Sequence, residues 1–322
     1  MFKLSKIIAA TLAVASLSGA AYAQEYPNRS IRLVVPFPAA GATDNVARVV
    51  AQKLGIELGQ PVVVDNRAGA AGVIGSDHVA KSAADGYTLL LTTPSTHSIG
   101  PLLNPKIQYN PKTDFTPIIY LAQSPQVMIV PLSSPAKTVA EFIAYAKANP
   151  GKLNFGSAGT GGIVHLSGER FKSAAGLDMT HIPYKGTALA MPDLIAGRLD
   201  LMFDSLSTAA PMVRDGKVRA LGVTSDTPVQ ALPNVPPVSA TVPGYGSQTW
   251  FGVFGPANLP EPVVAKLNAA LNKVLLDQEV KAQMQTLGFD PAGGTQADFA
   301  KKLQDDVNNW QKVITEANIK LD

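Results

Sequence analysis

Short apolar runs, each followed by a segment with apolar residues at helical spacing, recur along the first third of the chain. The runs are typical of buried parallel strands, and after the first run Val46, Val50 and Leu54 share one helical face. We expect strands at 31–35, 61–65 and 87–93, and helices at 43–59 and 72–86. This order predicts a parallel sheet with right-handed crossovers, and Thr43 or Asp44 is expected to cap the first helix.

The pattern restarts after a long apolar run. Residues 115–130 are too long for one ordinary strand, and we expect them to divide at Ser124-Pro125, as the chain crosses into a second lobe. Thr138 and Glu141 have the spacing of a capping box, which predicts the start of a helix. After it we expect strands at 153–157, 180–184, 200–204 and 218–224, alternating with helices at 163–175, 188–197 and 208–216.

A second crossing is expected near residue 248. Five prolines in residues 228–244 predict an extended loop, and residues 249–257 have the pattern of a returning strand. Helices are expected at 261–276, 279–287 and 296–317. The pattern therefore predicts an α/β protein with a cleft between two lobes, one made of residues 24–122 and 248–322 and the other of residues 123–247.

The first 23 residues have the features of a secretory signal peptide. Lys3 and Lys6 precede an apolar run that is shorter than a membrane span. Ala21-Tyr22-Ala23 has the form of a cleavage site, so we expect export with cleavage near Ala23. Without the two lysines, the 27 Lys and Arg fall to 25, against 24 Asp and Glu. This balance gives no reason to expect nucleic acid or a membrane surface as a partner.

The glycine-rich stretch Asn154–His165 is the first candidate for chemistry. Two of its glycines have the spacing of a phosphate-binding loop, but Gly162 and Ile163 stand where that loop needs a lysine and a hydroxyl. Ser157 is not flanked as in the nucleophile elbow of a hydrolase, and no histidine follows His181. Nucleotide hydrolysis is therefore not expected, and a serine hydrolase is a remote alternative.

Neither a metal nor a cofactor is expected. The four histidines are scattered, no two have the spacing of metal ligands, and the chain has no cysteine. Asp44 and Asp204 are interpreted as polar residues at the ends of elements rather than as an acid–base pair.

Two junctions between a strand and a helix, at residues 34–48 and 154–165, place small residues and hydroxyls just before a helix. A helix N-terminus offers unpaired N–H donors and a partial positive charge. The carboxyl ends of parallel strands face the cleft of such a protein. Either junction alone is as well interpreted as an ordinary turn, but the pair is expected to hold an anion from two sides without lysine or arginine.

The chain resembles the Bug-type periplasmic solute receptors of tripartite tricarboxylate transporters. The segments that carry the resemblance include "YPNRSIRLVVPFPAAGATDNVARVVAQKL" and "LNFGSAGTGGIVHLSGERFK", and they lie at 26–54, 61–91, 153–172, 181–205, 216–225 and 249–268. The resemblance implies a type II periplasmic binding fold with two crossing segments, located in the periplasm and without enzymatic activity. It also implies a small carboxylate as ligand, membrane permease subunits as partners, and action as a monomer.

In that family two loops hold the ligand carboxylate. On this chain the resemblance assigns Thr43 and Thr160 as side-chain donors, Ser95 or Thr96 as an added polar contact, and Asp204 as the contact to the far end of the ligand or to a bound water. The full set of implied ligand-binding residues is Pro38, Ala39, Ala40, Gly41, Ala42, Thr43, Asp44, Ser95, Ser157, Ala158, Gly159, Thr160, Gly161, Gly162 and Asp204.

Three questions stay open at this point. The ligand is an amino acid, a di- or tricarboxylate, or an aromatic acid, and an amino acid would use Asp204 as the acceptor for its ammonium group. The output is transport or, alternatively, signalling through a membrane kinase. Ala40 stands where the family usually has glycine, and alanine disfavours a positive φ.

Overall fold

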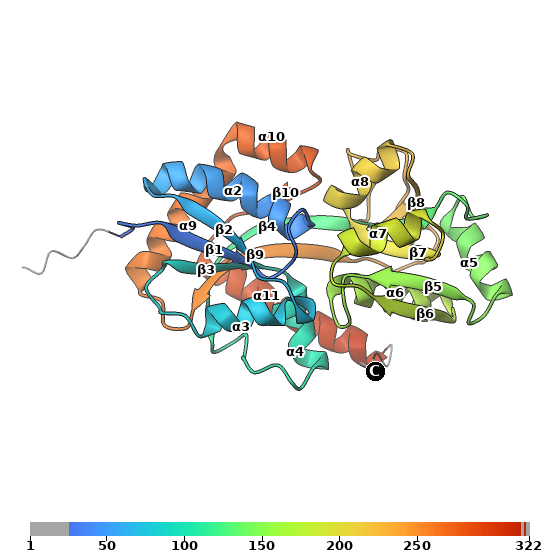
Figure 1. Cartoon of the computed structure of the whole chain (residues 1–322), viewed down its shortest axis with the longest axis horizontal. Helices are drawn as coiled ribbons and strands as arrows, with labels where there is room; N and C mark the ends of the chain where they lie inside the picture. Colours follow the sequence, from blue (N-terminus) through green and yellow to red (C-terminus); the bar gives the residue numbers. More distant parts are fainter. Residues whose placement is uncertain (1–25, 317–318, 320–322) are drawn as a thin grey trace, which may run out of the picture.

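Two lobes joined by two long strands make up the chain in the computed structural model, which describes residues 26–316 and 319 (Figure 1). The predicted signal peptide lies outside the described residues. In Figure 1 the first lobe, with β1 to β3, lies on the left, and the second, with β5 to β8, lies on the right. Strands β4 and β9 run between them.

The strands form one ten-stranded sheet in the order β2-β1-β3-β9-β4-β7-β5-β6, with β8 and β10 also pairing with β4. Pairing is parallel within each lobe, between β1 and its neighbours β2 and β3 and between β5 and its neighbours β6 and β7. Pairing with β4 and β9 is antiparallel. The strands are β1 (Ile31–Val35), β2 (Val62–Asn66), β3 (Thr88–Thr92), β4 (Phe115–Pro131), β5 (Leu153–Ser157), β6 (Met179–Pro183), β7 (Leu201–Ser205), β8 (Val218–Val223), β9 (Gln248–Pro256) and β10 (Asp290–Pro291).

The expected division of the long apolar run is wrong, because β4 is one continuous strand of 17 residues. Up to Pro125 it pairs with β9, and from Gln126 onward it pairs with β7 and β8. Proline has no N–H for a ladder bond, but it is tolerated here because the strand changes partners at this point. The lobe boundaries expected from the sequence, at residues 123 and 248, stay a prediction.

The helices cover both faces of the sheet in each lobe (Figure 1). Among the described residues, no helix is both long and apolar enough to cross a membrane. The helices are α2 (Ala42–Leu58), α3 (Val73–Ala80), α4 (Gly100–Leu103), α5 (Val139–Ala148), α6 (Ile163–Ala175), α7 (Thr187–Ile195), α8 (Leu206–Arg214), α9 (Glu261–Leu276), α10 (Gln278–Thr286) and α11 (Gln296–Glu316).

The helix ends agree with the local sequence pattern at some positions and differ from it at others. The capping box before α5 is confirmed, since Thr138 Oγ1 accepts a hydrogen bond from the N–H of Glu141 at 3.1 Å. Helix α3 stops at Ala80 rather than near residue 86, and in the loop beyond it Asp85 Oδ1 accepts from the N–H of Tyr87. The proline-rich segment 228–244 is a loop, apart from one turn of 3-10 helix at Val238–Ala240.

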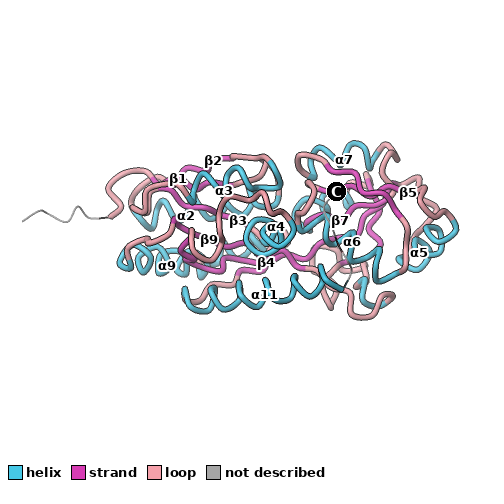
Figure 2. The backbone as a smooth tube through the Cα atoms, turned by 90° about the horizontal axis from the view of Figure 1, so that it is seen from below, coloured by secondary structure: helices cyan, strands magenta, loops and turns pink. Residues whose placement is uncertain are grey.

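Helix α11 links the two lobes a third time (Figure 2). Near its start Phe299 and Leu303 pack with residues of the first lobe such as Phe254. Near its end Trp310 and Ile314 belong to a cluster that is completed by Ile99, Ile163, Val164, Leu166 and Ile319. Because α6 belongs to the second lobe, this cluster holds the start of α6 against the first lobe.

Replacing Gly252 of β9 by alanine should destabilise the first lobe. A Cβ at this position would overlap the ring carbons of Phe299, which is itself fully buried. We expect the free energy of unfolding, measured by denaturant titration, to fall by about 1–3 kcal/mol.

Gly246→Ala is the matched control. The nearest atom to its Cβ would be the carbonyl oxygen of Thr224 at 3.7 Å, an ordinary contact. Its effect should stay within about 0.5 kcal/mol. Equal stabilities for the two variants would show that Phe299 does not press on β9.

Candidate functional site

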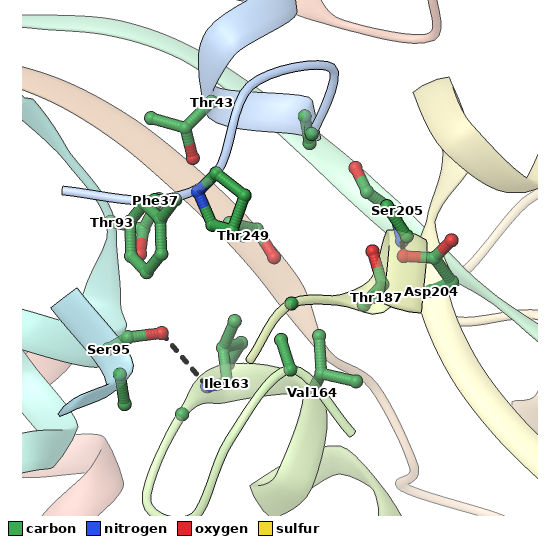
Figure 3. A pocket seen from close by; sticks show the side chains of 18 of the residues that line it. Phe37, Thr43, Thr93, Ser95, Ile163, Val164, Thr187, Asp204, Ser205 and Thr249 are labelled. Carbon is green, nitrogen blue, oxygen red and sulfur yellow. Dashed lines mark hydrogen bonds between the residues drawn. The ribbon is translucent and has the colours of Figure 1, made fainter. Parts of the chain in front are cut away.

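A cavity of about 90 Å³ lies between the lobes, at the carboxyl ends of the parallel strands. Figure 3 shows Phe37, Thr43, Thr93 and Ser95 on one side, Thr187, Asp204 and Ser205 on the other, and Ile163 and Val164 below. The lining residues are Phe37, Pro38, Ala39, Gly41, Ala42, Thr43, Ala71, Thr93, Ser95, Gln126, Ala158, Gly162, Ile163, Val164, Gly186, Thr187, Ala188, Asp204, Ser205, Thr249 and Phe251.

The first wall is built around the start of α2. Its N-cap is Gly41 and not Thr43 or Asp44, as the sequence led us to expect, because Ala42 already begins the helix. The N–H groups of the first turn therefore have no acceptor within the helix, and Gly41, Ala42 and Thr43 all line the cavity. Ala40 adopts a φ of 62°, so this alanine takes the left-handed conformation that glycine usually supplies.

Asp44 supports this loop from behind rather than lining the cavity. Its Oδ2 accepts from the N–H of Ala40 at 2.9 Å and from Arg48 Nε at 2.9 Å. Its Oδ1 accepts from Asn66 Nδ2 at 3.0 Å. Burial alone would raise the pKa of Asp44, but these hydrogen bonds outweigh burial and lower it. Asp44 thus stays ionised and holds the unusual backbone of Ala40 in place.

The second wall is built around the starts of α6 and α7, whose N-caps are Gly162 and Gly186. The N–H of Ile163 donates to Ser95 Oγ at 3.0 Å, which is a hydrogen bond between the two lobes (Figure 3). A Cβ on Gly186 would lie 2.9 Å from Pro38 Cγ, and one on Gly159 would lie 3.6 Å from Ala71 Cβ. The lobes are therefore in close contact across the cleft.

Two stacked histidines support the glycine-rich loop from below. His165 Nδ1 accepts from the N–H of Gly161 at 3.1 Å, and the His165 and His181 rings stack at 3.8 Å. Burial, followed by His181 and Lys172, lowers the pKa of His165 to about 3. His181 Nε2 lies 2.6 Å from Ser157 Oγ, the geometry that a serine hydrolase needs. Ser157 is fully buried and does not line the cavity, so a substrate there has no access to it.

Asp204 is the carboxyl group of the cavity. Its Oδ1 accepts from the N–H of Ser205 at 2.8 Å and its Oδ2 from Thr208 Oγ1 at 2.7 Å. Burial raises the pKa of Asp204 to about 6, although hydrogen bonds from Thr208, Ser205 and Thr187 oppose that rise. No lysine, arginine or histidine of the described residues lines the cavity, so N–H and O–H groups are its donors.

Nine of the fifteen residues predicted for the site line the cavity, namely Pro38, Ala39, Gly41, Ala42, Thr43, Ser95, Ala158, Gly162 and Asp204. The other six lie outside the lining: Ala40, Asp44, Ser157, Gly159, Thr160 and Gly161. Thr160 is exposed to solvent, although it was expected as a side-chain donor. Whether each of the fifteen contacts a ligand stays a prediction.

The residues that sequence reasoning missed come mainly from the floor of the cleft and from the start of α7. Gln126 of β4 and Thr249 of β9 lie on the two crossing strands, where no local motif marks them. Thr187 follows Gly186, and that glycine before a helical pattern was the one available signal.

The chain is similar to several known proteins. A family described as the tripartite tricarboxylate transporter family receptor matches residues 46–319. BugT from Bordetella pertussis is 34% identical over 323 residues, covering 100% of this chain and 99% of BugT. A solved R. palustris protein with adipate is 37% identical with a TM-score of 0.90, covering 92% of this chain and 99% of that one. MatC from Rhodopseudomonas palustris with bound malate is 33% identical with a TM-score of 0.85, covering 90% and 100%.

These similar proteins are solute-binding receptors and not enzymes. The two-lobe periplasmic binding fold predicted from the sequence is therefore confirmed.

Asp204→Asn should stabilise the protein at neutral pH. The pKa of Asp204 in the fold, about 6, lies above its ordinary value of 3.8, so ionisation of the buried carboxyl costs stability as pH rises through this range. The isosteric amide never ionises, and its gain over the native protein should reach at most about 3 kcal/mol near pH 7. Denaturant titrations at a series of pH values measure it.

Below about pH 3 the native carboxyl is protonated in both the folded and unfolded states, and the advantage of the variant should vanish. Asp215→Asn, an exposed position after α8, should change stability little at any pH. If the native protein and Asp204→Asn showed the same change of stability with pH, the assignment of a raised pKa to Asp204 would be contradicted.

Proposed function

The chain belongs to the family of tripartite tricarboxylate transporter receptors, and on this basis we propose that it captures a small carboxylate between its lobes and delivers it to a membrane permease. The observation that carries the proposal is the pairing of two helix N-termini, α2 from the first lobe and α6 from the second, around one cavity that no cationic side chain of the described residues lines. N–H dipoles fixed in this way solvate an anion without a counter-charge.

Carboxylate ligands of relatives support the ligand class. The two R. palustris structures contain adipate and malate respectively. We place the carboxylate of this chain's ligand between the first turn of α2 and the first turn of α6. Ile163 already donates its N–H to Ser95, so Ala42, Thr43 and Val164 supply the remaining first-turn N–H groups.

Lobe closure is the conformational change that reports ligand binding. A ligand that touches both walls binds the closed arrangement better than the open one and shifts the population toward it. The hydrogen bond from Ile163 N–H to Ser95 Oγ and the contact of Gly186 with Pro38 form only when the lobes meet. The permease thus distinguishes loaded from empty receptor by the closed surface.

The remaining proposals concern export, oligomeric state and the lobe boundaries. The first 23 residues serve as a cleavable signal peptide, and the receptor acts as a monomer in the periplasm. Residues 24–122 with 248–322 form the first lobe, and residues 123–247 form the second.

Thr43→Val and Ser95→Ala should each weaken carboxylate binding. Thr43 loses a hydroxyl that lines the cavity, and Ser95 loses the acceptor that joins the lobes. Each loss should cost about 1 kcal/mol, roughly fivefold in affinity. A thermal-shift panel of mono-, di- and tricarboxylates and amino acids identifies the ligand, because binding raises the melting temperature, and calorimetry then compares the variants.

Thr113→Val, at an exposed position outside the cavity lining, is the control and should bind as the native protein does. A panel in which only compounds without a carboxylate raise the melting temperature would contradict the proposal.

Delivery to a permease predicts uptake that depends on this receptor. Cells that lack the chain should accumulate little of the labelled carboxylate identified above, and the native chain should restore uptake. Unchanged accumulation in the deletion strain, with intact ligand binding by the purified protein, would point to an output other than transport.

A further inference from the structure

The two lobes meet where Pro38 of the first lobe faces Gly186 of the second. A Cβ placed on Gly186 would lie 2.9 Å from Pro38 Cγ, 3.5 Å from its Cδ and 3.7 Å from its Cβ. Carbon atoms of neighbouring side chains pack at about 3.5–4.0 Å, so the first of these distances is an overlap. Both residues line the cavity, and their contact is therefore part of its wall. A side chain at position 186 would keep the two lobes apart.

Pro38 lies in a loop that is held on both sides. Asn66 Nδ2 donates to the carbonyl oxygen of Phe37 at 3.2 Å, and the N–H of Ala40 donates to Asp44 Oδ2 at 2.9 Å. The proline ring is itself stiff, because it fixes the φ angle of its own residue. The ring therefore has little freedom to move aside for a larger residue on the other lobe.

Gly186 is also held, by contacts within the second lobe. The N–H of Tyr184 donates to the carbonyl oxygen of Ser157 at 3.1 Å, and the N–H of Leu189 donates to the carbonyl oxygen of Gly186 at 3.2 Å. The φ of Gly186 is 130°, a conformation that residues with a Cβ rarely adopt. Glycine is thus needed here for the turn into α7 and, separately, for the contact with Pro38.

A second contact across the cleft leaves more room. A Cβ on Gly159 would lie 3.6 Å from Ala71 Cβ, which is an ordinary packing distance. Space alone would admit a methyl group at position 159, whereas it would not at position 186. Of these two contacts, the one between Pro38 and Gly186 therefore sets the steric limit on closure.

We propose that Pro38 and Gly186 form the gate of the cavity and that Gly186 is a positioning residue for lobe closure. The ligand enters and leaves only when these two residues separate. The lack of a side chain on Gly186 then lets them meet again around the bound ligand. The inference rests on the proposed function, since it assumes that a ligand occupies the cleft.

A reversible disulfide tests the gate in the whole chain, which has no cysteine of its own. The Cβ atoms at positions 38 and 186 would be 3.7 Å apart, close to the mean of about 3.8 Å in disulfides. Pro38→Cys/Gly186→Cys should therefore form an intramolecular disulfide with oxidised glutathione, detected by mass spectrometry and by the loss of free thiols. Pro38→Cys/Gly216→Cys is the control and should form none, since no atom lies within 4 Å of a Cβ at Gly216.

The effect of the disulfide on binding is measured with the thermal-shift panel described above, which includes malate, adipate, citrate and glutamate. An acid that binds the reduced variant should not bind when it is added to the oxidised one, because the gate is already locked. Reduction should restore binding. When the same acid is added before oxidation, it should stay with the protein through gel filtration until the disulfide is reduced.

A double-mutant cycle tests the role of Gly186. Gly186→Ala should lower the affinity for that acid about tenfold, because its Cβ overlaps Pro38 and closure is incomplete. In the Pro38→Ala background the overlapping ring atoms are gone, and the same change should lower the affinity by less than about threefold. Gly294→Ala is the control for backbone strain and should leave affinity unchanged, since its φ is 106° and its nearest neighbour is Asp298 in the same lobe.

Pro38→Cys alone keeps Gly186 and carries the test if Gly186→Cys does not fold. Modification of its thiol with N-ethylmaleimide adds a bulky group at the contact and should abolish binding of an acid that the unmodified variant binds. Circular dichroism and the melting temperature show whether each variant is folded.

The outcomes separate the gate from the proposed function. The gate would be overturned, with the carboxylate receptor intact, by any of three results: no disulfide in the folded double variant, equal binding before and after oxidation or modification, or an equal effect of Gly186→Ala in both backgrounds. A panel in which no carboxylate raises the melting temperature of the native protein would overturn the proposed function and, with it, the gate.

Discussion

The change of partners along β4 is the constraint on which the rest of the molecule depends. Both lobes pair with this one strand, β9 up to Pro125 and β7 with β8 from Gln126, so the lobes share a sheet and yet are separate beyond it. The parallel strands of each lobe then end at the same gap, and the helices that follow them start there. Gln126 is the first residue of β4 that pairs with β7, and it belongs to the cavity lining.

Under the proposed function, a site formed in this way holds an anion by geometry rather than by charge. Lysine and arginine carry flexible side chains and a full charge, whereas N–H groups at a helix start are fixed before the ligand arrives. Their donors come from both lobes, so their combined effect exists only when the lobes approach. The hydrogen bond between Ile163 and Ser95 also requires the two lobes to be close together, so ligand binding and lobe closure are coupled.

The sequence predicted much of the fold, because apolar periodicity is local. Most strands and helices lie within about two residues of their expected positions. The break expected at Pro125 is wrong. Only the neighbouring residues of a proline are visible in the sequence, whereas whether a strand continues through it depends on which strands pair there. The site shows the same limit: Thr43 lies in a recognisable junction between a strand and a helix, but Gln126 and Thr249 come to the cavity only through long-range pairing.

The backbone of the first wall explains why residues outside the cavity matter to it. Ala40, Ala70 and Ala71 all have positive φ angles, which cost energy in alanine, and they lie in the two loops beside the cleft. Ala40 is held by Asp44, which in turn is held by Arg48 and Asn66. This network fixes the direction of the α2 N–H groups before any ligand binds. A carboxylate outside the cavity lining thus holds the backbone of the loop that forms the first wall, which a list of lining residues would not reveal.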